Sequence, residues 1–217
     1  MEHVFFKPWI GKNYKTGGIF HKKILVVGES HYCNGCNCCG LKYAKECEDL
    51  NTTQVVKDYL NPSKCSEKWE NTYRKFERSL VNRVTTLEDA KEIWQSIAFF
   101  NFLQVAMNEA RQSGTPEDYK EGQKAFLEVM DELQPNLIIV WGVGKLYEYL
   151  PGVKDGWILG DEFKVDEYNV KNGYYQRNEY KSRVIAIYHP SVGYSWDWWH
   201  KVIKKQLELL KTEEPTG

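Results

Sequence analysis

Four short apolar segments constrain the fold of this chain more than any other feature of the sequence. Each is nearly all apolar, is rich in β-branched or aromatic residues, and ends in a glycine or a polar residue, as buried strands do. The segments are Ile24–Gly28, Ser96–Asn101, Asn136–Gly142 and Val184–Tyr188. They predict four strands of one sheet.

Helical patterns separate the predicted strands. Apolar residues recur at spacings of three and four between Trp69 and Leu80, which is typical of an amphipathic helix. Thr115 followed by Pro116 predicts the start of a second helix, because threonine caps helix N-termini and proline is tolerated at the first position. We expect a last helix from about Trp196 to Leu210, and a hairpin or long excursion over residues 152–183.

Strands that alternate with helices predict a parallel sheet with helices on both faces. With 217 residues, the chain is expected to form a single α/β domain, a three-layer α/β/α sandwich around a four-stranded, mainly parallel sheet. Ligands of such sheets bind beyond the carboxyl ends of the strands. The residues to consider are therefore Glu29–Tyr32, Asn101, Trp141–Gly144 and His189–Ser191.

Composition limits the partners and the compartment. The net charge is −1, which argues mildly against a protein that coats nucleic acid, although residues 1–23 carry five lysines against one glutamate. No apolar run has the length of a membrane span, and the N-terminus lacks the apolar core of a signal peptide. We expect a monomer in the cytoplasm with no membrane partner.

All six cysteines fall in one third of the chain. They are Cys33, Cys36, Cys38, Cys39, Cys47 and Cys65. Without a secretory signal, this clustering favours a metal or an iron–sulfur cluster over disulfides. The spacing lacks the paired C-x2-C units of common zinc sites. At most four of the six would ligate zinc or an iron–sulfur cluster, and reduced thiols or opportunistic disulfides are the alternative.

The strand ends, read in order, resemble the uracil-DNA glycosylase superfamily over most of the chain. The first motif is "GESHY", from Gly28 to Tyr32, where family members carry glycine followed by glutamine or glutamate. Asn101 ends the second strand, "LQPNLIIVWG" matches the third, and "HPS", His189 to Ser191, follows the fourth. The iron–sulfur-type members place two cysteines before the first motif, whereas this chain has none before Cys33.

The resemblance implies hydrolysis of the N-glycosidic bond of a uracil or another deaminated or damaged base that is flipped out of DNA. Glu29 would handle the attacking water and His189 the leaving base anion. Asn101 would pair with the base edge and Tyr32 would limit the size of the base. Residues that match the family's motifs or its DNA-inserting loop complete the implied site: Gly28, Ser30 and Ser191 around the base, and Tyr194, Trp196 and Trp198 as wedges into DNA.

Two other functions stay open. Ser30 stands where the best-known members have an aspartate, so a catalytically degenerate module that binds a nucleic acid or a nucleotide is one alternative. A water-positioning Glu29 near His189 would favour the enzyme, and a Glu29 turned to solvent would favour the binder. The more remote alternative is an esterase with Ser30 as nucleophile, His200 as base and Asp197 orienting it.

Overall fold

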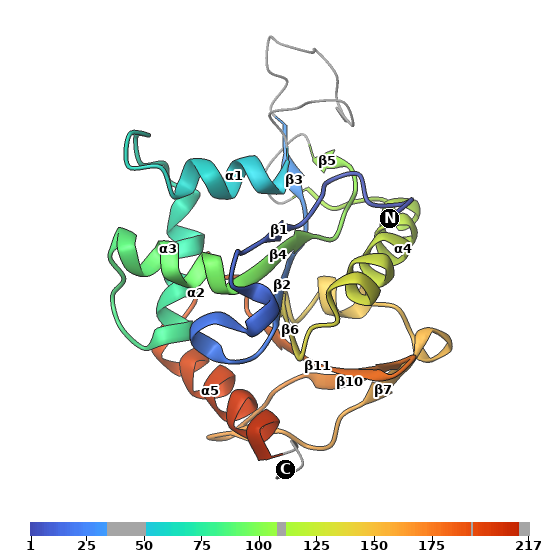
Figure 1. The fold of residues 1–217 in the computed structure, drawn as a ribbon. Helices are drawn as coiled ribbons and strands as arrows, with labels where there is room; N and C mark the ends of the chain where they lie inside the picture. The colour runs from blue at the N-terminus through green and yellow to red at the C-terminus, as the bar shows by residue number, and fades with distance from the viewer. Residues whose placement is uncertain (34–50, 108–111, 192, 213–217) are drawn as a thin grey trace.

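A seven-stranded mixed sheet forms the centre of the molecule (Figure 1). The computed structural model describes residues 1–33, 51–107, 112–191 and 193–212. The strand order is β1-β4-β2-β6-β11-β10-β7. Its four central strands run parallel and contain the four predicted segments: β4 (Ile97–Asn101), β2 (Ile24–Gly28), β6 (Leu137–Trp141) and β11 (Tyr180–Ile187).

The sheet is wider than the sequence predicts, so the expectation of four strands is wrong. β1 (Trp9–Ile10) pairs antiparallel with β4 at one edge. At the other edge β10 (Asn172–Arg177) pairs antiparallel with β11, and β7 (Trp157–Leu159) with β10. These edge strands are short or carry polar residues and glycine, so they lack the apolar pattern that reveals a buried strand.

Two small paired segments lie outside the main sheet. β3 (His31–Tyr32) pairs in parallel with β5 (Ala106–Met107), and β8 (Lys164–Val165) pairs antiparallel with β9 (Tyr168–Asn169). The β10–β11 and β8–β9 hairpins confirm the expected hairpin character of residues 152–183. The short 3-10 turns are Tyr14–Thr16, Gly18–Phe20, Leu146–Tyr149 and Val153–Asp155.

Two helices begin where the sequence predicts. The Thr115 side chain accepts from the Asp118 backbone and Pro116 opens α4 (Pro116–Leu133), which confirms the predicted start. α5 (Trp196–Thr212) begins at the predicted residue. The other helices are α1 (Thr52–Tyr59), α2 (Glu70–Val81) and α3 (Leu87–Ser96).

Helices cover both faces of the sheet, because successive side chains of each buried strand point to opposite sides. Val26 and Ile139 face a core shared with α1, α2, α3 and α5. Val27 and Val140 face a second core against α4. Figure 1 shows α4 on one side of the sheet and α2, α3 and α5 on the other. Within the described residues, no helix has both the length and the apolar character needed to cross a membrane.

Candidate functional site

The chain reverses its winding direction beside β2. The connection after β2 leads to β4 on one side, whereas the connection after β6 leads to β11 on the other. β2 and β6 are neighbours, and the connections after them lead to opposite sides, the arrangement that forms a ligand crevice in open α/β sheets. Ligands of open α/β sheets bind at such a switch point. Glu29 follows β2 directly and Lys145 follows β6, which places both at this crevice.

Glu29 is held from two elements across the switch point. Lys145 Nζ lies 2.5 Å from Glu29 Oε1, and the Tyr119 hydroxyl of α4 donates to the same oxygen. Tyr119 is itself fixed by stacking on Tyr149, with ring centroids 3.7 Å apart. Among the described residues, the hydrogen bond and the ion pair of this carboxylate both use Oε1. Oε2 is therefore available to a water or a ligand.

His189 lies close enough to Glu29 for their charges to interact. Crowding by protein atoms lowers the pKa of His189, and the negative charge of Glu29 partly opposes that shift. Ser191 Oγ lies 3.0 Å from His189 Nδ1, and the Trp141 ring lies edge-on to the imidazole at 5.8 Å. If the Ser191 hydroxyl donates to Nδ1, the neutral ring carries its proton on Nε2 and can donate from there. Lys75 Nζ donates to the Ser191 carbonyl and ties this loop to α2.

Asn101 is buried at the end of β4 and is bonded to a second histidine. Its Nδ2 lies 3.0 Å from His31 Nε2, which also lies 3.0 Å from Thr52 Oγ1. Burial lowers the pKa of His31 to about 4, so the ring is neutral and the lone pair of Nε2 can accept from the Asn101 amide. With Nδ2 engaged, Asn101 presents Oδ1 as an acceptor. A Cβ at Gly28 would lie 2.7 Å from Oδ1, so glycine is needed for this close approach.

Two buried polar atoms near the crevice have no hydrogen-bond partner among the described residues. They are the Ser30 hydroxyl, directly after Glu29, and Trp141 Nε1 at the end of β6. Trp141 is only 3 % exposed. Most buried polar groups in proteins are bonded, so such atoms need a water or a ligand. Their position at the strand ends is consistent with a ligand at the switch point.

The remaining residues of the predicted base site differ in position. Tyr32 lies in β3 and its side chain is 46 % exposed. It therefore faces solvent in this structure rather than closing a pocket over a base. The structure thus brings Glu29, Ser30, Asn101 and His189 to one sheet edge and leaves Tyr32 at its margin.

The three predicted DNA wedges are not equally accessible. Tyr194 is 8 % exposed and its hydroxyl donates to Ser79 Oγ at 2.8 Å. The expectation that Tyr194 projects as a wedge is therefore wrong, because the ring packs parallel to Trp199 in the core. Trp196 and Trp198 are half-buried against the same core. Burial of Trp199, as expected for the last helix, is confirmed.

Two of the six cysteines lie in the part of the chain that the structure describes. Cys33 is buried with Phe6 and Ala106, whereas Cys65 is exposed. The other proposed ligands, Cys36, Cys38, Cys39 and Cys47, lie outside the described residues. Within residues 1–33, 51–107, 112–191 and 193–212, no three histidine, cysteine or acidic side chains form a metal-binding group. The zinc or iron–sulfur site stays a prediction.

The esterase constellation is not assembled. His200 Nδ1 bonds the Ser79 carbonyl at 3.0 Å, and Asp197 accepts from Ser195. The Ser30 hydroxyl has no partner in the part of the chain that the structure describes. A nucleophilic serine needs its base within hydrogen-bond reach. The interpretation of Ser30 as the nucleophile of a triad with His200 and Asp197 is therefore wrong.

The sequence does not predict the contacts of three residues at this site. Lys145 lies one residue beyond the range examined after the third strand, Trp141–Gly144. Tyr119 occupies the apolar face of α4 and is seven residues before Phe126, so its periodicity indicates a core residue. His31 stands in the first motif, but no sequence signal shows that it contacts Asn101.

No protein-family model matches the chain, and no curated protein matches it either.

Proposed function

We propose that the crevice hydrolyses the N-glycosidic bond of a deaminated or damaged base flipped out of DNA. The proposal includes a uracil-DNA glycosylase-like arrangement of the four parallel strands and their helices. The observation that carries it is the proximity of Glu29 and His189 at the switch point, close enough for their charges to interact, with Glu29 Oε1 held by Lys145 and Tyr119. Glu29 is not turned to solvent, since its side chain is 22 % exposed.

Each residue has one chemical task in this reaction. Glu29 Oε2 accepts a proton from water as the water oxygen bonds to C1′ of the sugar. The bond from C1′ to the base nitrogen breaks, and its electron pair leaves with the base. His189 Nε2–H donates to the base oxygen on which this negative charge gathers. Its lowered pKa favours a neutral donor over an imidazolium near neutral pH.

Asn101 supports a preference for deaminated bases. With one N–H of Nδ2 bonded to His31, the amide orientation is fixed, so Oδ1 accepts a hydrogen bond and the second N–H of Nδ2 can donate one. Deamination turns the unprotonated ring nitrogen of cytosine or adenine into an N–H donor in uracil or hypoxanthine. An acceptor at this point would therefore pair with the deaminated base and face a lone pair on the parent base.

The test is excision from oligonucleotides that contain uracil, hypoxanthine or xanthine, scored as alkali-labile abasic sites. The protein is purified anaerobically, because the cysteines could hold an oxygen-sensitive group. We expect Glu29→Gln and His189→Ala each to lower the rate by about 10²- to 10⁴-fold. Glu162→Gln and His21→Ala, exposed positions away from the crevice, serve as matched controls. Absence of any excision by the wild-type protein would overturn the proposal.

The degenerate binder is the second candidate, and the Lys145–Glu29 ion pair favours it. Lys145 Nζ lies 2.5 Å from Glu29 Oε1, so part of the carboxylate is already used in an ion pair within the protein. A binder would retain affinity for an oligonucleotide while giving no abasic product. Binding of the three substrates is therefore measured in parallel with excision, so that the two functions are separated.

A further inference from the structure

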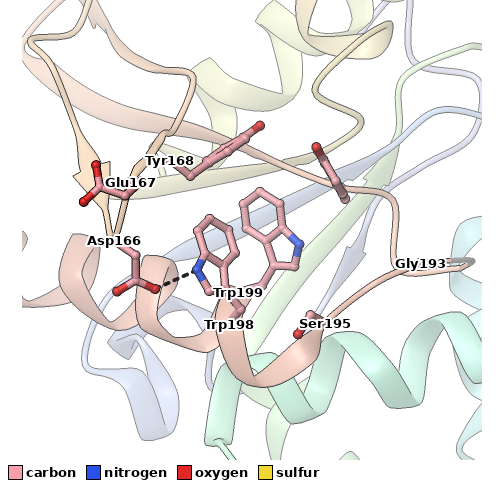
Figure 2. Close-up of a pocket in the computed structure, with 8 residues that line it drawn as sticks. Asp166, Glu167, Tyr168, Gly193, Ser195, Trp198 and Trp199 are labelled. Carbon is pink, nitrogen blue, oxygen red and sulfur yellow. Dashed lines mark hydrogen bonds between the residues drawn. The ribbon is translucent and has the colours of Figure 1, made fainter.

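A pocket lies between the β8–β9 hairpin and the start of α5 (Figure 2). Its volume is about 450 Å³. Four aromatic side chains and two carboxylates dominate its lining: Tyr168, Tyr188, Trp198, Trp199, Asp166 and Glu167. None of these residues takes part in the proposed glycosidic chemistry.

The rings are arranged as walls rather than as a stack. Tyr168 lies at 90° to Trp198 and at 80° to Trp199, and the two tryptophans lie at 83° to each other. The three rings therefore form the corner of a box. Tyr188 adds a further wall, at 87° to Tyr168 and with its centroid 5.2 Å from that of Trp199. Figure 2 shows the rings of Tyr168, Trp198 and Trp199 close together, with Asp166 beside Trp198.

The pocket also carries negative charge. Asp166 is fixed in place, since its Oδ2 accepts from Trp198 Nε1 at 2.9 Å and from Lys201 Nζ at 3.2 Å. Hydrogen bonds to these two groups hold the pKa of Asp166 below its usual range, so it is ionised. Glu167 is exposed beside it and forms no ion pair with another described residue. The charge of Lys201 balances that of Asp166, so the charge of Glu167 makes the pocket negative overall.

We propose that this pocket binds an organic cation whose charge carries apolar substituents, such as a methylated ammonium group. The negative faces of aromatic rings attract cations, and methyl groups fill an apolar corner that would not replace the water shell of a bare ammonium. The carboxylates add attraction in the same direction. A nucleotide fits less well, because its phosphates would be repelled by Asp166 and Glu167.

The test compares choline with 3,3-dimethyl-1-butanol, which has the same shape but no charge. Each is titrated into the full chain, and binding is followed by calorimetry and by tryptophan fluorescence. We expect choline to bind at least about 10-fold more tightly than the neutral alcohol, a ratio typical of cation–π recognition. Adenosine 5′-monophosphate is titrated as the probe for base stacking.

Two exposed positions allow substitution without opening the core. Glu167→Gln and Tyr188→Leu are expected to weaken choline binding by about 3- to 10-fold each. Glu162→Gln, an exposed carboxylate near the same hairpin that pairs with Lys164, is the control and should leave it unchanged. Equal affinity for choline and the alcohol, or no binding of either, overturns the proposal. Tighter binding of the nucleotide that survives Glu167→Gln also overturns it, in favour of a stacking platform.

Discussion

Glu29 and Glu77 are two carboxylates that each accept a hydrogen bond from a tyrosine, yet their surroundings differ. Glu77, in α2, is fully buried and accepts from Tyr59, Trp94 and Thr85 at 2.6 to 2.8 Å. Both of its oxygens are used. Glu29 is partly exposed, and its Tyr119 and Lys145 contacts use one oxygen. The comparison teaches that a satisfied buried carboxylate joins helices together, whereas a half-satisfied one at a switch point is prepared for a ligand.

The largest expected effect separates the two carboxylates by stability. Glu77→Leu leaves three donors without their acceptor inside the core, which we expect to cost about 3–6 kcal/mol of unfolding free energy. Glu29→Leu removes a partly exposed ion pair and leaves one donor, the Tyr119 hydroxyl, without its acceptor, so it should cost about 1–2 kcal/mol. Urea denaturation of both variants measures the difference. Similar losses in the two variants would mean that Glu29 is as structural as Glu77.

The next largest expected effect is the pH dependence of the unfolding free energy that is caused by His31, at the candidate site. Its folded pKa, about 4, lies below the ordinary value of 6.5. The neutral folded form is therefore favoured above pH 6.5, and its stabilisation is lost as the pH falls from 6.5 towards 4. Relative to His31→Gln, the wild-type protein should lose on the order of 3 kcal/mol between pH 7 and pH 4. If the free energies of unfolding of the two proteins changed with pH in the same way, the pKa of His31 would not be lowered by burial.

The two tyrosines form a matched pair. Tyr119→Phe removes the donor to Glu29 and should lower glycosidic activity by about 10-fold, because the carboxylate loses orientation, with little change in stability. Tyr59→Phe removes the donor to Glu77 and should cost about 1–2 kcal/mol without lowering the rate constant. Excision rates and urea midpoints are measured on both variants. If the two variants lost the same activity and the same stability, the proposed difference between Glu29 and Glu77 would be contradicted.

The smallest effect is a change in pH dependence at Glu77. Burial raises the pKa of Glu77, and hydrogen bonds from Tyr59, Trp94 and Thr85 oppose that shift. For an acid with a raised folded pKa, stability falls as the pH rises from the unfolded value towards the folded one. The Glu77→Gln protein lacks this loss, so its stability relative to the wild type should increase over that range. Thermal unfolding at several pH values measures this change in relative stability. A stability difference between the two proteins that stays constant with pH would contradict the prediction.

The central strands could be predicted because burial on both faces leaves a short apolar run in the sequence. β2 has the predicted bounds, and β4 and β6 differ from the prediction by a single residue at one or both ends. The edge strands could not be predicted in this way, because β1 has only two residues and β10 carries tyrosines and polar groups. An edge strand is stabilised by its neighbour, and that pairing leaves no periodic signal.

The sequence alone determined which polar residues end the buried strands: Glu29, Asn101 and His189 follow from the apolar runs before them. Only the tertiary structure decided what each of them contacts. Lys145 reaches Glu29 from the loop after β6 and Tyr119 reaches it from α4, and His31 bonds the amide of Asn101. Strand burial is local and is recorded in residue type, whereas these contacts join segments up to 116 residues apart, as between Glu29 and Lys145, and depend on how the sheet is ordered.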